Sequence, residues 1–128
     1  MGFSEFLSTI MKYLTFIAPY VSQFVGILLE VLSKQEQIDN GIITKALARE
    51  AVVDYSMRTY AGKFDYPETD SRMLTQLAVR MMKVIGVENS RELANFLTRY
   101  NDYWAALGTP TPHDETDYME FYTQHYKK

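Results

Sequence analysis

The chain contains no cysteine in its 128 residues. Disulfide bonds, zinc sites with thiolate ligands and cysteine nucleophiles are therefore excluded together. The six glycines occur singly, so no glycine-rich loop precedes a helix and the easily recognised phosphate-binding motifs are missing. The absence of cysteine leaves the cellular compartment open, because a reducing cytosol permits cysteine without requiring it.

An excess of basic residues is also missing. Thirteen Lys and Arg residues face sixteen Asp and Glu residues, which gives a net charge of -3 and an isoelectric point of about 5.3. Proteins that bind nucleic acid normally present a basic face to the phosphate backbone. We therefore expect no nucleic-acid partner.

Candidate catalytic and metal-binding residues are sparse. His113 lies in the acidic run 113–117, but neighbouring residues of a helix point in different directions, whereas metal sites in bundles take ligands from facing helices. His125 stands near the chain end, with no nucleophile or orienting acid at a diagnostic spacing. We interpret both histidines as solvated, and predict a protein that is not an enzyme, with no cofactor, no metal and no small-molecule substrate.

The residue pattern predicts an all-α bundle of about five helices. No strand-like alternation of useful length and no internal repeat occurs, and the content of 47% apolar and 23% charged residues is typical of a folded globular domain. We divide the chain into an apolar N-terminal helix at 1–34, a three-helix body at 35–108, and a proline-containing linker with a Tyr-rich C-terminal helix at 109–128.

The strongest pattern is an apolar row at the N-terminus, whose members are separated alternately by four and three residues. This spacing is typical of a helix that packs on other helices. We call the row the N-terminal seam; its residues are Phe3, Leu7, Ile10, Leu14, Ile17, Val21, Phe24, Leu28 and Val31. Apolar neighbours widen the seam and leave a narrow polar strip that includes Pro19, so we predict a bend at this proline.

Capping residues and breakers suggest the remaining helix ends. We expect a polar hinge at 33–40, then a helix over about 42–61 that Asp39 or Asn40 caps and that buries the row containing Leu47. A loop at 63–70 precedes a third helix that starts at Thr69 or Asp70 and ends at Gly86. Its predicted inward residues are Leu74, Leu77, Ala78, Met81 and Ile85. A capping box of Asn89 and Glu92 opens a fourth helix that Gly108 closes.

Aromatic residues concentrate in the last thirty positions. Tyrosine and tryptophan combine apolar area with a polar tip, which suits either an interface or the roof of a small core. We leave both interpretations open, and the candidate contact residues are Tyr103, Trp104, Tyr118, Tyr122 and Tyr126.

The N-terminal seam can be buried in three ways. It can form the chain's own core, it can associate with a second copy or a partner's helix, or it can enter a membrane. Residues 13–29 carry no charge, which is at the short limit for spanning a bilayer of about 30 Å hydrocarbon thickness. A secretory signal is not expected, because Glu5 stands where basic residues belong and no small-x-small cleavage site follows.

From these observations we predict a structural or adaptor subunit that assembles with itself or a protein partner through the N-terminal seam. Such a protein would be intracellular or part of a virion, and viral or phage structural components are one class in which short cysteine-free helical chains occur. Two alternatives remain open at this point. One is a membrane-active protein, pore-forming or anchored, with a soluble helical tail, and the other is a small inhibitor or regulator of a partner enzyme.

Overall fold

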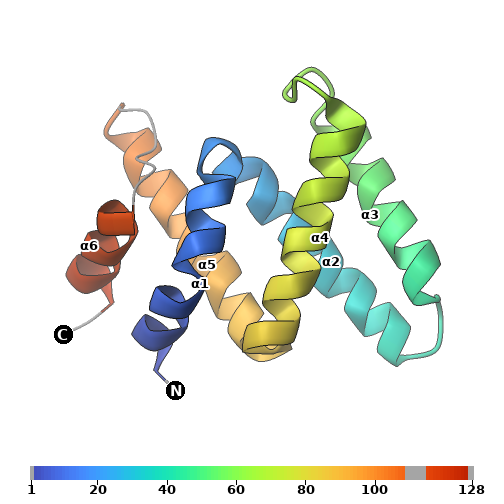
Figure 1. Ribbon diagram of the computed structural model, residues 1–128, viewed down its shortest axis with the longest axis horizontal. Helices are drawn as coiled ribbons and strands as arrows, with labels where there is room; N and C mark the ends of the chain where they lie inside the picture. Colours follow the sequence, from blue (N-terminus) through green and yellow to red (C-terminus); the bar gives the residue numbers. More distant parts are fainter. Residues whose placement is uncertain (1, 109–114, 127–128) are drawn as a thin grey trace.

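The computed structural model describes residues 2–108 and 115–126. The described part of the chain is all-helical and contains no strand, which confirms the predicted fold class. The long apolar N-terminal helix is also confirmed, as two halves named α1 (Phe3–Ile17) and α2 (Val21–Asp39). Helices α3 to α6 complete the fold (Figure 1).

The bend predicted at Pro19 is present as a single 3-10 turn over Ala18–Tyr20. Proline has no backbone N–H, so it cannot continue the hydrogen-bond ladder of α1. The N–H of Ala18 instead donates to the carbonyl of Thr15, which is the tighter bond of a 3-10 helix. The two halves therefore meet at an angle, and the seam follows the bend.

Helix α2 extends to Asp39, so the hinge expected at 33–40 is wrong. Polar side chains of this stretch support the helix through pairs one turn apart. Gln35 Nε2 donates to Asp39 Oδ1 at 2.9 Å, and Lys34 Nζ lies 3.5 Å from Glu30 Oε1. Such pairs stabilise a helix slightly, and no glycine or proline interrupts the chain between Gly26 and Gly41.

Helix α3 (Lys45–Thr59) differs from prediction in its cap and in its buried face. Thr44 caps it by accepting a hydrogen bond at 3.3 Å from the N–H of Leu47, because Asp39 and Asn40 already belong to the end of α2. Leu47, expected inside, is 62% exposed. The residues that α3 buries are Ala48, Val52, Val53 and Ser56. Small side chains on this face allow α3 to lie close to its neighbours, and Ser56 Oγ donates to Ser71 Oγ of α4 at 3.0 Å.

Helix α4 (Pro67–Ile85) begins earlier than predicted, because Pro67 occupies the first helical position, where its missing N–H costs nothing. All five residues predicted to face inward are buried. The predicted end at Gly86 is confirmed, with a φ of 83° and an N–H that donates to the carbonyl of Met82. Only glycine adopts this φ without strain.

Helix α5 (Val87–Ala106) begins directly after Gly86, so the predicted capping box at Asn89 and Glu92 is wrong. Asn89 instead donates from Nδ2 to the carbonyl of Ile85 at 2.7 Å, which satisfies the end of α4. Helix α6 (Glu115–His125) is the last element. The linker predicted at 109–112 lies outside the described residues.

Helix α2 lies at the centre and packs against α3, α4 and α5, while α1 packs against α6 and α4. In Figure 1 the helices form an elongated arrangement with α6 at one end and α3 at the other. The two halves of the seam therefore share α4 as a neighbour, while α6 packs on the first half and α3 on the second.

A close approach between α2 and the loop after α3 depends on Gly26. A Cβ atom at this position would overlap the hydroxyl oxygen of Tyr60. The Tyr60 ring is held edge-on by Tyr55 and Phe64, with centroids at 6.4 and 6.2 Å. Burial, together with the neighbouring Tyr55, raises the pKa of Tyr60 to about 12, so this hydroxyl is neutral at physiological pH.

Candidate functional site

The N-terminal seam lies inside the molecule. Eight of its nine side chains are buried, from Leu7 to Val31, and Phe3 is partly buried against the same core. Of the three ways of burying the seam, this conformation uses the chain's own core. A second molecule can therefore reach the seam only if one of the helices that cover the seam is displaced.

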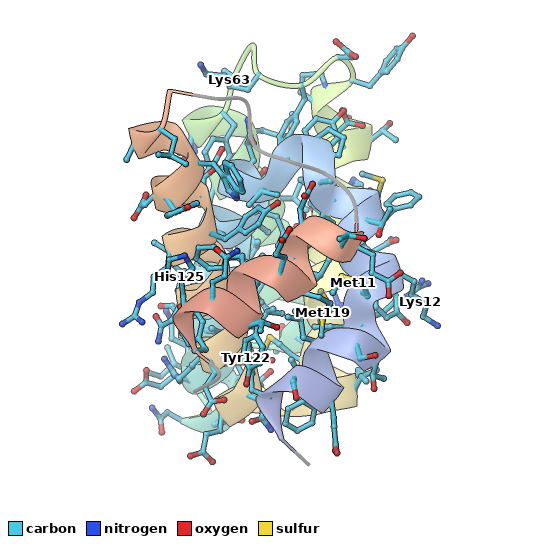
Figure 2. All side chains as sticks on the ribbon, turned by 90° about the vertical axis from the view of Figure 1, so that its left-hand side faces the viewer. Met11, Lys12, Lys63, Met119, Tyr122 and His125 are labelled. Atoms are coloured by element: carbon cyan, nitrogen blue, oxygen red, sulfur yellow. The ribbon has the colours of Figure 1, made fainter. Side chains whose placement is uncertain are left out.

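Helix α6 covers the first half of the seam. The hydroxyl of Tyr118 donates to the carbonyl of Leu14 in α1 at 3.4 Å, and its ring stacks on Tyr100 of α5 with centroids 4.7 Å apart. The ring of Phe3 contacts that of Tyr122 at a tilt, with centroids 5.5 Å apart. Figure 2 faces this end of the molecule, with α6 in front of α1 and α5. Burial raises the pKa of Tyr118 well above its usual value, and the nearby Asp117 adds to this effect.

The structure brings the seam and the Tyr-rich segment together, although the prediction treated them as two surfaces. Tyr118 is fully buried, and the other four candidate contact residues are partly buried against the core. These five residues pack together with four further aromatic residues of α1, α5 and α6, and we call all nine the aromatic cluster. Its members are Phe3, Phe96, Tyr100, Tyr103, Trp104, Tyr118, Phe121, Tyr122 and Tyr126. The rings thus roof the core in this conformation.

Two polar atoms of the aromatic cluster are buried without a hydrogen-bond partner among the described residues. They are Nε1 of Trp104 and the hydroxyl of Tyr126. Leaving such a group unsatisfied costs about 1 to 3 kcal/mol. Of the two, the Tyr126 hydroxyl belongs to the C-terminal segment that packs on Phe96 of α5, so this contact carries a local energetic cost.

A second site, which sequence reasoning missed, is a pocket of about 280 Å³ between α2, α3, α4 and the start of α5. Most of its lining is apolar and includes Val31, Ile38, Ala48, Val52, Val79 and Met82. Helices α3 and α4 are joined at one end by the Ser56–Ser71 hydrogen bond, and Figure 1 shows them diverging toward the other. The pocket lies where they diverge, with α2 as its floor.

Four basic residues line this pocket: Lys34, Lys45, Arg49 and Lys83. Lys34 is paired with Glu30, but the other three have no ion pair within residues 2–108 and 115–126. No Asp or Glu of the described residues lines the pocket. We call Lys45, Arg49 and Lys83 the cationic rim.

Glu50 of α3, whose carboxylate bridges to α4, is already occupied. Glu50 accepts hydrogen bonds from Arg72 at 3.0 and 3.4 Å. These bonds, with the charge of Arg72, hold the pKa of Glu50 below its usual value, so it stays ionised and bound to Arg72. The cationic rim is therefore left without a neutralising partner in the described structure.

The sequence contained one signal for the pocket that we interpreted differently. Lys45 and Arg49 are four residues apart, on the same side of the helix as Ala48 and Val52. The prediction that the row containing Leu47 is buried leaves Lys45 and Arg49 outside the inward face of this helix. The correct face places them at the edge of an apolar hollow.

No group of three or more His, Cys, Asp or Glu side chains in the described part of the chain is arranged to hold a metal ion. His125 is exposed, and its ring contacts Phe121 and Tyr103 with centroids at 4.4 and 4.9 Å. His113 and Asp114, the start of the acidic run, lie outside the described residues.

Comparison with protein-family models, with curated proteins and with solved structures gives no match, so function is argued from the residues of this chain.

Proposed function

We propose that the protein is a non-enzymatic adaptor subunit that binds a partner helix on α1, in the place that α6 occupies. The observation that carries this proposal is that one helix of eleven residues, α6, covers the first half of the N-terminal seam. The second half of the seam lies against α3, α4 and α5 together, whereas α1 packs mainly on α6 and to a smaller extent on α4, so displacement of α6 alone would uncover much of the α1 half.

The energetics of α6 support such an exchange. Isolated helices shorter than about 12 to 15 residues are marginal in water, so α6 depends on its contacts with α1 and α5 for its stability. The Tyr126 hydroxyl, which has no hydrogen-bond partner among the described residues, weakens the contact of the C-terminal segment with α5. A partner helix with the same apolar spacing and better hydrogen bonding can compete for the site.

The exchange can be tested with a fluorescently labelled peptide that has the sequence of residues 115–126. Tyr118→Ala and the milder Tyr122→Ala loosen the chain's own α6, so each full-length variant should bind the peptide more tightly than wild type, by anisotropy titration. The matched control is Tyr66→Ala, because Tyr66 is 75% exposed and lies away from α6. Equal or absent binding by all four folded proteins would contradict the proposal.

A membrane-active protein is the second candidate, because the segment Phe3–Asp39 is long and apolar enough to cross a membrane by length and composition. Half of its most apolar window is buried inside the molecule, so insertion would require the core to open. Flotation with vesicles of phosphatidylcholine and phosphatidylglycerol tests this candidate. Co-flotation accompanied by loss of the near-ultraviolet aromatic signal supports insertion, and a protein that stays at the bottom of the gradient contradicts it.

A further inference from the structure

We infer that the pocket between α3 and α4 binds a single-chain anionic amphiphile, with its alkyl chain inside the pocket and its carboxylate at the cationic rim. This inference goes beyond the proposed function, since it concerns the opposite end of the molecule from α6. It rests on the size of the pocket, on the charges around it and on one buried hydroxyl.

The apolar lining and the volume favour an alkyl chain of limited length. An apolar cavity of about 150 Å³ is known to hold benzene, so 280 Å³ has room for about ten to twelve carbon atoms. The pocket is too small for a helix, which needs a channel about 10 to 12 Å across. A flexible chain that ends in one polar group fits it better than a segment of folded protein.

The charges favour a negative head group. Lys45 and Arg49 lie one turn apart on α3, and Lys83 comes from the facing part of α4. Their ammonium and guanidinium groups can donate several charge-assisted hydrogen bonds to one carboxylate, and arginine can do so with two parallel bonds. A neutral or cationic head group would leave the rim unpaired.

Thr75 provides an independent indication that the pocket takes an occupant. It lines the pocket, is only 3% exposed, and its Oγ1 has no hydrogen-bond partner among the described residues. Buried hydroxyl groups nearly always have a partner. Because the bound alkyl chain has no hydrogen-bonding group, a water molecule held beside the chain would supply the partner of Thr75 Oγ1.

The inference can be tested by calorimetric titration of the full-length protein with straight-chain carboxylates from hexanoate to tetradecanoate, each below its micelle concentration. Each added methylene should raise the affinity about fourfold while it enters the pocket. The increase should stop at about ten to twelve carbons, where the pocket is full. Decanol and decyltrimethylammonium should bind roughly tenfold or more weakly than decanoate, since they do not pair with the rim.

Variants separate the head-group contact from the chain contact. The double variant Lys45→Gln/Arg49→Gln should bind decanoate roughly tenfold more weakly and leave decanol unchanged. Arg80→Gln is the matched control, because Arg80 is exposed on α4 and does not line the pocket. Val79→Phe should fill the pocket and abolish the binding of both decanoate and decanol, with circular dichroism showing that the fold is retained.

Three results of the titrations would overturn the inference. They are no binding of any carboxylate, equal affinity for decanoate and decyltrimethylammonium, or affinity that rises with chain length without a limit. Adsorption to anionic vesicles without binding of monomeric decanoate would assign the cationic rim to a membrane surface instead, and would also overturn it. The peptide-exchange assay on α6 does not involve the pocket, so failure of either proposal can be recognised independently of the other.

Discussion

Gly26 stands in the interior of α2, where alanine would normally be favoured by about 1 kcal/mol. Its presence is explained by Tyr60, whose hydroxyl occupies the space of the missing Cβ atom. The ring of Tyr60 cannot move aside freely, because it packs against Tyr55 and Phe64. One residue without a side chain thus allows an aromatic residue from another element to lie directly on the central helix.

We predict that Gly26→Ala lowers the free energy of unfolding by about 1 to 3 kcal/mol, the usual cost of overpacking a core. In a Tyr60→Phe background the same substitution should cost less, because the overlapping oxygen is gone, although Cζ of the ring would still lie 3.0 Å from the new Cβ atom. Urea denaturation of the four proteins of this cycle measures the coupling. Additive effects of the two substitutions would contradict the proposed overlap.

At the residue scale, periodicity predicted the seam because large apolar side chains repeat along one face. The same reasoning failed at α3, where it selected Leu47 over Ala48 as the buried residue. Ala48 is buried because it is small and lets the helices approach, which a pattern of large apolar residues does not reveal. The bond from Tyr118 to Leu14 was also beyond prediction, since it joins residues far apart in the chain.

At the scale of single helices, caps decide where an element begins, and α3 provides a direct test. Thr44→Ala removes the acceptor for the N–H of Leu47 and should lower the free energy of unfolding by about 1 kcal/mol. Asn40→Ala is the matched control, because Asn40 caps no helix start in the structure and should change stability by less than about 0.5 kcal/mol. Thermal denaturation measures both. A larger loss of stability in Asn40→Ala than in Thr44→Ala would contradict this assignment and support Asn40 as the cap of α3.

The ends of helices were harder to predict than their existence. The sequence analysis predicted Asp39 or Asn40 as the cap of the second helix, whereas Thr44, a few residues later, caps it in the structure. The side-chain pair between Gln35 and Asp39 belongs to α2, which extends to Asp39 and so removes both predicted caps. At Gly86 the sequence was sufficient to locate the end of α4, since a single glycine at the end of a periodic stretch has few other uses.

At the scale of the whole molecule, α2 is the element on which the others depend. It contacts α3, α4 and α5, so the seam residues from Val21 to Val31 connect helices that are distant in sequence. The pocket shares this dependence, because its lining comes from four helices. Its existence could not be predicted from the sequence, since it requires knowing how α3 and α4 diverge over α2.

Two truncations test this arrangement. Removing residues 1–34 takes away the centre of the core, so the remaining chain should lose its cooperative thermal transition and its near-ultraviolet aromatic signal. Removing residues 109–128 takes away only α6 at one end, so that chain should still unfold cooperatively, at a lower temperature. Differential scanning calorimetry distinguishes the two outcomes. A cooperative transition in the chain of residues 35–128 would show that the N-terminal half is not the centre of the core.

The joint between α4 and α5 consists of Gly86 alone, and this limits how the protein can change in length. One inserted residue would turn the start of α5 by about 100° about its axis, at 3.6 residues per turn. Leu93, Phe96 and Leu97 would then leave the core together. The connection between α2 and α3 has several residues and no such constraint. Related sequences that keep this fold should therefore vary in length between α2 and α3, and not at Gly86.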